Sequence, residues 1–324
     1  MEQISLYTLF VLGFFLLIKG ADYLVEGASS LAKRLGVSTL VIGLTVVAFG
    51  TSTPELVVNI IAAIQGSGDI ALGNIIGSNM ANLLLILGIA ALITELKVQH
   101  STVWKEIPFS FLAALVLLVF SSVAFLDNSG IKHILRFEGI TLLLFFAIFL
   151  YYVIGLAKRN AGQMEDEKLI VKREPAWKIS LMIVGGLVAL YFGGEWIVSG
   201  AVGIARQLHL SELLISSTII AIGTSLPELV TSVTAALKKD TDLAVGNVIG
   251  SNIFNIFWIL GVTSIIRPIQ LSVPAVTDIA LLMAATTLLF AFMFVGGRHQ
   301  LDRWQGGVFI ALYVAYLVFL VVRG

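Results

Sequence analysis

The sequence predicts an all-α protein that crosses a membrane many times, and both its composition and its apolar runs lead to that prediction. Of the 324 residues, 58% are hydrophobic and only 12% are charged, whereas soluble domains carry about 25% charged residues. The mean hydropathy is +1.00. A helix that spans a bilayer needs about 20 mainly apolar residues, and the chain has room for ten such runs.

The apolar runs set the expected helices and their division into two groups of five. The first run is too long for a secretory signal peptide and lacks a basic segment before it, so we expect it to remain as a helix. Five runs fall in residues 1–157 and five in 177–324, with a short polar linker at 158–176. The expected spans are roughly 5–32, 38–64, 70–94, 103–126, 134–157, 177–205, 211–237, 243–267, 274–296 and 302–322.

The basic residues of the connecting loops predict how the chain is oriented. Fourteen lysines and arginines flank one set of loops, including 158–176, and five flank the other set. Because cytoplasmic loops carry the excess of basic residues, we expect the linker in the cytoplasm and both termini outside it. The protein is therefore expected to be a multi-pass protein of the cell membrane, that is, the inner or plasma membrane.

A polar pattern interrupts the apolar runs twice, at a constant offset of 173 residues. The first copy reads GTSTPEL at 50–56 and GNIIGSNMAN at 73–82, and the second reads GTSLPEL at 223–229 and GNVIGSNIFN at 246–255. A shared offset without gaps indicates an internal duplication. Since each copy has five spans, an odd number, the second copy enters from the opposite face. We therefore predict two inverted-topology five-helix repeats.

Each copy places a proline and a glutamate near the middle of a span. Pro54 and Pro227 cannot donate to the carbonyl four residues earlier, so each frees backbone oxygens inside its helix. Glu55 and Glu228 follow directly, and a charged side chain at that depth costs roughly 2.5–3.5 kcal/mol. No Lys, Arg or His lies near the middle of a span to neutralise them. The glutamates must therefore be protonated or hold cations.

The side chains around these glutamates decide which cations are expected. The chain has no Cys, and the spans show no His or Met cluster, so soft metals are disfavoured. Oxygen ligands in flexible geometry suit Ca²⁺ and Na⁺ better than Mg²⁺, which keeps its waters. We also expect Asp69 and Asp242 to cap the helices that follow them. The candidate oxygen ligands beside the glutamates are Thr51, Ser52, Ser78, Asn82, Thr224, Ser225, Ser251 and Asn255.

The paired blocks closely resemble the alpha repeats of the sodium/calcium exchanger family. The resemblance covers both blocks and nearly the whole chain, and the short linker is similar to that of prokaryotic members. It implies that Glu55 and Glu228 bridge Ca²⁺, with Asn82 and Asn255 flanking the centre. Because both of these positions are Asn, neither a potassium requirement nor a direct proton role is expected there. The remaining ligands that the resemblance implies are the carbonyls of Thr51 and Thr224 for Ca²⁺, and Ser52, Ser78, Ser225, Ser251 and the carbonyls of Ala48 and Ala221 for Na⁺.

The sequence therefore predicts a secondary antiporter that exchanges Na⁺ for Ca²⁺ by alternating access and moves net charge. It predicts no enzyme activity and no cofactor. The net charge of zero also predicts no nucleic-acid partner. The expected partners are the transported ions and the lipid bilayer, and no obligatory protein partner is evident. A Ca²⁺/H⁺ antiporter that uses the same glutamates is the main alternative, and a cation channel lined by the same half-helices is a weaker one.

Overall fold

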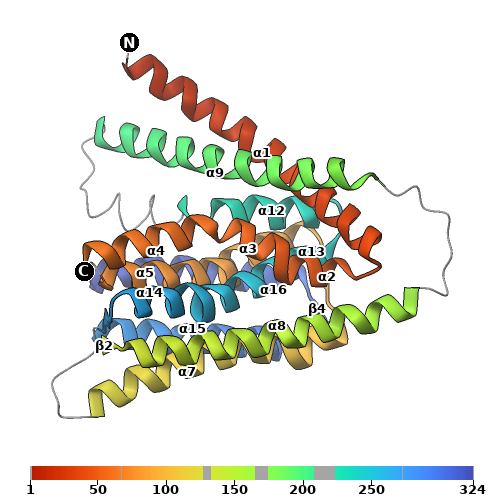
Figure 1. The fold of residues 1–324 in the computed structure, drawn as a ribbon. Helices are drawn as coiled ribbons and strands as arrows, with labels where there is room; N and C mark the ends of the chain where they lie inside the picture. The colour runs from red at the N-terminus through yellow and green to blue at the C-terminus, as the bar shows by residue number, and fades with distance from the viewer. Residues whose placement is uncertain are drawn as a thin grey trace.

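The computed structural model describes residues 2–66, 68–126, 133–164, 174–207, 223–271 and 273–323. Helices dominate this part of the chain and lie side by side in a bundle (Figure 1). Four segments, labelled η, have the wider turn of a π-helix. The helical elements are α1 (Glu2–Leu35), α2 (Thr39–Ile42), η1 (Gly43–Val47), α3 (Ala48–Thr51), α4 (Thr53–Gln65), α5 (Gly68–Met80), η2 (Ala81–Ile86), α6 (Leu87–Ile93), η3 (Thr102–Glu106), α7 (Ile107–Leu126), α8 (Arg136–Met164), α9 (Ala176–Gln207), α12 (Leu226–Leu237), α13 (Thr241–Ile253), η5 (Phe254–Leu260), α14 (Gly261–Ile266), α15 (Val273–Phe292) and α16 (Arg303–Arg323).

The helices are long and apolar enough to confirm an all-helical, multi-pass membrane protein. In the described part of the chain, eight helices meet the length and hydropathy of a membrane span. A ninth span results if Thr39–Thr51 and Thr53–Gln65, which meet at a 45° bend, are counted as one. Of the predicted run 211–237, residues 211–222 lie outside the described residues, and α12 alone is a shorter apolar helix. The count of ten spans and the inverted repeat remain predictions.

Two helix ends in the described residues differ most from the expected ones. The helix predicted to end at residue 157 continues as α8 to Met164, so the chain is still helical at the start of the predicted linker. The run predicted to reach residue 296 ends at Phe292. There the chain turns through Gly296, whose φ of 84° suits a residue without a Cβ, and the Asp302 carboxylate accepts a hydrogen bond from the amide of Gly297.

Two short antiparallel ribbons, which the sequence did not predict, join loops that are far apart in the chain. One pairs β1 (Leu96–Lys97) with β4 (Gln300–Leu301), and the other pairs β2 (His133–Ile134) with β3 (Ile269–Gln270). Each ribbon links a loop in the first half to a loop in the second half. The connections between helices are thereby tied to each other at both ends of the bundle.

Helices α1 and α9 pack along one another at one side of the bundle, with α7 and α8 on the opposite side in this view (Figure 1). Glycines allow the close approach. A Cβ at Gly13 would lie 2.9 Å from the carbonyl oxygen of Gly193, and a Cβ at Gly20 would lie 2.9 Å from that of Gly186. Small residues of this kind let helices meet closely in membranes. The two contacts exchange under the 173-residue offset, because Gly13 corresponds to Gly186 and Gly20 to Gly193.

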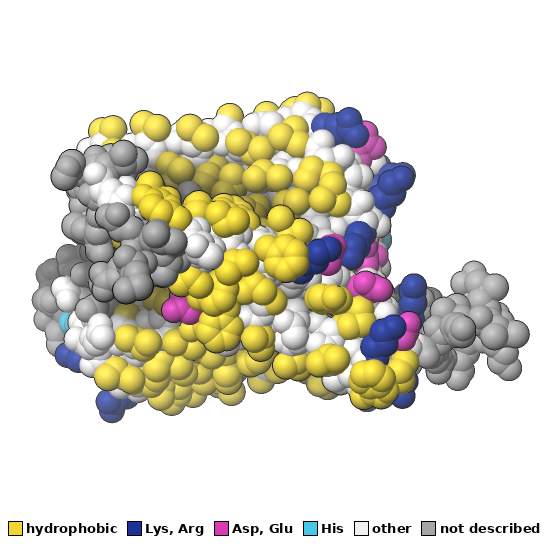
Figure 2. All heavy atoms as spheres, turned by 90° about the horizontal axis from the view of Figure 1, so that it is seen from above, with side chains coloured by type: hydrophobic (Ala, Val, Ile, Leu, Met, Phe, Trp, Pro, Cys, Tyr) yellow, Lys and Arg dark blue, Asp and Glu magenta, His cyan; other side chains and the backbone are white. Residues whose placement is uncertain are grey.

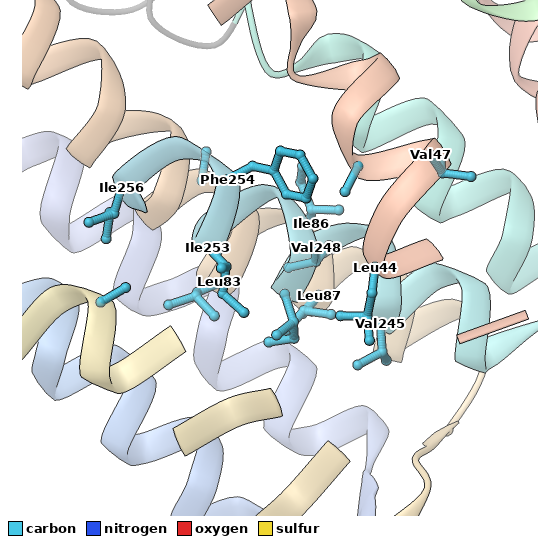
Figure 3. Packing of buried hydrophobic residues seen from close by; sticks show 14 of the residues in the cluster. Leu44, Val47, Leu83, Ile86, Leu87, Val245, Val248, Ile253, Phe254 and Ile256 are labelled. Carbon is cyan, nitrogen blue, oxygen red and sulfur yellow. The ribbon is translucent and has the colours of Figure 1, made fainter. Parts of the chain in front are cut away.

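The buried core surrounds α13, which crosses the middle of the bundle. Side chains from η1, η2 and α13, among them Leu44, Leu83 and Val248, point toward one another and are fully buried (Figure 3). Helix α13 approaches the second span closely because a Cβ at Gly246 would already lie 2.9 Å from the carbonyl oxygen of Leu40. This packing fixes the position of the second polar block relative to the first helix break.

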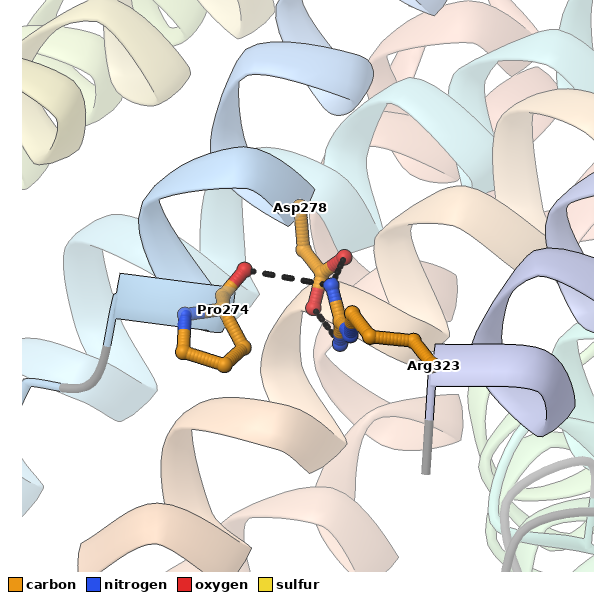
Figure 4. Close-up of polar contacts among 3 residues, drawn as sticks. All are labelled: Pro274, Asp278 and Arg323. Carbon is orange, nitrogen blue, oxygen red and sulfur yellow. Dashed lines mark hydrogen bonds and ion pairs between the residues drawn. The ribbon is translucent and has the colours of Figure 1, made fainter.

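Charged residues gather at the ends of the bundle. At one end, Arg34 at the end of α1 donates to the carbonyl of Glu174 just before α9, and β1 pairs with β4. Most of the charged side chains on the face shown in Figure 2 lie at one end, whereas apolar side chains cover its length. An ion pair joins α15 to α16, where the Arg323 guanidinium donates two hydrogen bonds of 2.8 and 2.9 Å to the Asp278 carboxylate (Figure 4).

Candidate cation site

The second span breaks where the first GTSTPEL block falls, and the second block forms the same break. Ser52 has φ −83° and ψ 8°, and Ser225 has φ −86° and ψ 5°. A proline follows at the start of the next helix in each case, where its missing N–H costs nothing. Glu55 and Glu228 therefore lie in the first turns of α4 and α12. The positive end of a helix dipole favours a negative charge at that place.

Both glutamates are buried and lie close enough to repel one another. Their exposed fractions are 0% for Glu55 and 1% for Glu228, and their carboxylates interact electrostatically. The hydroxyl of Ser52, in the first copy, donates to Oε1 of Glu228, in the second copy, at 2.8 Å. Ser251 donates to the same oxygen at 3.5 Å. The carboxylate of the second copy is thus held partly by the helix break of the first.

Several buried oxygen atoms in this region have no hydrogen-bond partner among the described residues. Oε2 of Glu228 and both carboxylate oxygens of Glu55 are without one, although an unsatisfied buried polar group is costly. In the described part of the chain, no ion pair reaches either glutamate. Oxygen atoms of predicted ligands that share this condition are Ser78 Oγ, Ser225 Oγ, Asn82 Oδ1 and Asn255 Oδ1.

Four asparagines form a reciprocal network between the two copies. The amide of Asn82 donates to Oδ1 of Asn252 at 2.9 Å, and the amide of Asn255 donates to Oδ1 of Asn79 at 2.8 Å. These bonds use the amide nitrogens of Asn82 and Asn255 and leave their oxygens free. Sequence reasoning gave Asn79 and Asn252 no role, although both stand inside the repeated GSN triplet. They orient the predicted ligands.

A second reciprocal pair joins the helix breaks to the neighbouring helices. Thr51 donates to Oδ1 of Asn247 at 3.2 Å, and Thr224 donates to Oδ1 of Asn74 at the same distance. The amide of Asn247 also donates to the hydroxyl of Ser232 at 2.9 Å. Asn74 and Asn247 are the second residues of the repeated GN pair, and the sequence gave no reason to assign them a contact. Each helix break is therefore fixed by the opposite copy.

The segments that carry Asn82 and Asn255 are π-helical, which the sequence did not predict. Asn82 lies in η2 and Asn255 in η5. Such wide turns are rare and often occur at functional sites. No residue type marks them, because the sequence pattern of an α-helix and that of a short π-segment are alike. Because a π-helical turn is wider than an α-helical one, each π-segment shifts the side chains that follow it around the helix axis.

The carbonyl oxygens of Ala48 and Ala221 were both predicted to be Na⁺ ligands. The carbonyl oxygen of Ala48 accepts the amide of Ser52 at 3.0 Å and the hydroxyl of Thr51 at 3.4 Å. It therefore serves the turn that ends at the helix break, and its predicted role as an ion ligand stays a prediction. Ala221 lies outside the described residues.

A hollow of about 300 Å³ lies against the helix breaks. Thr51, Pro54 and Pro227 border it on the side of the breaks, and Leu187 and Tyr191 of α9 border it on the other. The breaks thus do not close completely against α9.

The two helix breaks and the neighbouring polar blocks contribute two carboxylates, hydroxyls and amide oxygens, which are ligands for hard cations.

Comparison with known proteins identifies the family. The family model described as sodium/calcium exchanger protein matches residues 5–155 and 178–322. The chain belongs to this family. The putative antiporter CaxA of Alkalimonas amylolytica is 40% identical over 95% of this chain and 97% of its own. The sodium/calcium exchanger MaX1 of Methanosarcina acetivorans is 33% identical over 97% of this chain and 98% of its own.

A solved structure supports the same assignment. The sodium-calcium exchanger NCX_Mj, soaked with 10 mM Na⁺ and zero Ca²⁺, matches with a TM-score of 0.82 and 31% identity, over 98% of this chain and 99% of that chain. Members of the family are exchangers and antiporters, not enzymes, and their transported ions are substrates. The protein is therefore a membrane antiporter of the cation/Ca²⁺ type and a prokaryotic-type member, as its sequence predicted.

Proposed function

We propose that the protein exchanges Na⁺ for Ca²⁺ at one site that the two copies share, with access alternating between the two sides of the membrane. One observation carries this proposal. Among the described residues, Glu55 and Glu228 are buried without a basic partner, and further buried oxygen atoms of the two repeated blocks also lack hydrogen-bond donors. A bound cation would supply the missing positive charge to all of these atoms at once. The names of MaX1 and NCX_Mj agree with Na⁺ and Ca²⁺ as substrates.

We propose the ligands that the family resemblance implies, and the unpartnered oxygens of the described residues support this assignment. Glu55 and Glu228 bridge Ca²⁺, helped by the carbonyls of Thr51 and Thr224. Na⁺ uses the serine hydroxyls at 52, 78, 225 and 251, with the alanine carbonyls at 48 and 221. Asn82 and Asn255 flank the centre through their free oxygens. The two ions compete for the same carboxylates, and this competition couples their movements.

The charge of the site predicts an electrogenic exchange. Two carboxylates neutralise one Ca²⁺, so exchange for three Na⁺ moves one net positive charge. Moving one charge through the membrane is worth about 2.3 kcal/mol per 100 mV. Because positions 82 and 255 are both Asn, neither can bind a proton or add a third negative charge to the centre.

Flux in proteoliposomes tests the coupling ion. Vesicles that contain the purified protein and Na⁺ are diluted into Na⁺-free medium with ⁴⁵Ca²⁺. We expect Ca²⁺ uptake that follows the Na⁺ gradient and responds to an imposed membrane potential. Uptake that follows a pH gradient and ignores Na⁺ would instead establish a Ca²⁺/H⁺ antiporter.

Substitution of the glutamates tests the site. Glu55→Gln and Glu228→Gln are expected to abolish Ca²⁺ flux and Ca²⁺ binding, while the protein still inserts and elutes as one species. Glu174→Gln serves as the matched control, since Glu174 is half-exposed and pairs with Lys178 near the end of the bundle. Near-normal Ca²⁺ flux in either site variant would refute the assignment.

The same proposal includes the orientation and the repeats. We propose that residues 1–157 and 177–324 are inverted repeats, that 158–176 is cytoplasmic, and that both termini are extracytoplasmic. The reciprocal contacts at the 173-residue offset support the repeats. The chain lacks cysteine, so single cysteines at Ser129 and Gln163 can be labelled from either side. Labelling of both from the same side would contradict the inversion.

A further inference from the structure

Besides Glu55 and Glu228, the described residues contain another fully buried glutamate, Glu106. Glu106 ends the π-helical segment η3 and has an exposed fraction of 0%. One of its oxygens, Oε1, accepts a hydrogen bond from the hydroxyl of Tyr152 in α8. The other, Oε2, has no hydrogen-bond partner among the described residues. No hydrogen bond given for the described residues links Glu106 to the residues around Glu55 and Glu228.

Two more unpartnered oxygens stand on the same short segment. The hydroxyls of Ser101 and Thr102 are buried and lack hydrogen-bond partners in the described part of the chain, and Thr102 is 1% exposed. In a π-helix the hydrogen bond runs from residue i to i+5, so Ser101 lies one turn before Glu106. The Thr102 side chain lies near the Glu106 carboxylate, without a hydrogen bond between the two. The hydroxyls of Tyr152 and Thr102 therefore lie beside the Glu106 carboxylate, and Ser101 precedes Thr102 on the same helical stretch.

Among the described residues, Glu106 forms no ion pair. The charged or titratable groups placed against it are Lys105, on its own segment, and Tyr152, from α8. The Lys105 ammonium lies 5.4 Å from the centre of the Tyr152 ring, as in a cation–π contact, and forms no ion pair with Glu106 within the described residues. A buried carboxylate without an ion-pair partner is stabilised by a proton or a bound cation.

The ligand set selects a monovalent ion. One carboxylate balances one positive charge, whereas Ca²⁺ would leave an excess charge buried beside Tyr152. Hydroxyl and carboxylate oxygens are hard ligands. We propose that Ser101, Thr102, Glu106 and Tyr152 form a second cation site, which binds one Na⁺ in exchange for a proton on Glu106. Binding converts the carboxylic acid and Na⁺ into the sodium carboxylate and a released H⁺.

Sodium binding to a protein with a disabled transport site tests this proposal. The background is the Glu55→Gln/Glu228→Gln double variant, purified in detergent and measured with ²²Na⁺ at equilibrium. We expect saturable binding of a single Na⁺ per chain, and an H⁺ release on Na⁺ addition that a pH-sensitive dye records in weak buffer. Adding Glu106→Gln should remove both signals, and adding Glu174→Gln should change neither.

Two further variants keep the carboxylate and so separate binding from folding. Tyr152→Phe and Thr102→Val each remove one hydroxyl, and each should weaken Na⁺ binding by about tenfold in a protein that elutes as one species. The proposal is overturned if the double variant binds no Na⁺ saturably, if binding survives Glu106→Gln, or if both hydroxyl variants bind Na⁺ like their parent. None of these results bears on the transport site, whose own test is Ca²⁺ flux.

Discussion

Ser52 and Ser225 occupy equivalent positions in the two copies but are not equivalent in the structure. Ser52 donates to the Glu228 carboxylate at 2.8 Å, whereas the hydroxyl of Ser225 has no hydrogen-bond partner among the described residues. Both serines are buried, with exposed fractions of 1% and 2%. Replacing each serine by alanine removes a hydroxyl, which is hydrogen-bonded to Glu228 at position 52 and has no partner among the described residues at position 225. We predict that Ser52→Ala destabilises the ion-free protein and that Ser225→Ala does not.

The expected size follows from the partner. A hydrogen bond to a charged group contributes about 1.5–3 kcal/mol. Without Ser52, the hydrogen bond that remains to the Glu228 carboxylate within the described residues is the 3.5 Å contact with Ser251. One kcal/mol shifts the melting temperature by roughly 2–4 °C in a domain of 150–250 residues, and by less in a longer chain. Ser52→Ala should therefore melt a few degrees below Ser225→Ala in buffer without Na⁺ or Ca²⁺.

Size-exclusion chromatography after heating, with fluorescence detection, gives the two melting temperatures in detergent. The measurement is repeated with saturating Ca²⁺. This should reduce the difference between the two melting temperatures, because the bound cation then stabilises the Glu228 carboxylate that Ser52 otherwise stabilises by a hydrogen bond. Equal melting temperatures without ions, or a lower one for Ser225→Ala, would show that the Ser52–Glu228 bond does not hold the site together.

Three other substitutions test the contacts that surround the site. Thr51→Val removes the hydrogen bond to Asn247 at 3.2 Å and should cost about 1 kcal/mol of stability and slow Ca²⁺ uptake in proteoliposomes. Gly186→Leu should separate α9 from α1 and stop transport, since a Cβ there already lies 2.8 Å from α1 backbone atoms; Gly185→Leu, with nothing within 4 Å, is the control and should transport normally. Asp278→Asn breaks the pair with Arg323 and should lower the free energy of unfolding by about 1–3 kcal/mol, measured as a lower melting temperature, while Ca²⁺ binding, measured by calorimetry, is unchanged.

The sequence predicted the buried glutamates correctly because burial and charge are coupled in a membrane protein. Glu55 and Glu228 stand in apolar runs without a basic neighbour. Because a charged side chain in lipid is costly, they were expected to face a polar interior. The duplicated offset then predicted which residues correspond. It could not predict that Glu228 accepts two serine bonds while Glu55 accepts none, since both copies have the same serines.

Other features depend on contacts that a single segment does not encode. The prediction that Asp242 caps α13 was wrong, because Asp240 is the cap and accepts from the amide of Leu243, while Asp242 accepts from Gln99. Both aspartates have the right chemistry, and tertiary contacts decide between them. The ribbons are only two residues long on each side, too short for an alternating pattern. Glu106 fell inside the predicted span 103–126, where the sequence gave it no role, because its contact with Tyr152 comes from another helix.

The exchange of threonine and asparagine bonds between the copies bears on whether either half could stand alone. Thr51 reaches Asn247 while Thr224 reaches Asn74, so each half supplies what the other half lacks. A polypeptide of half this length would bury those groups unsatisfied unless a sister molecule completed them. The two halves therefore depend on each other to satisfy their buried polar groups at the helix breaks.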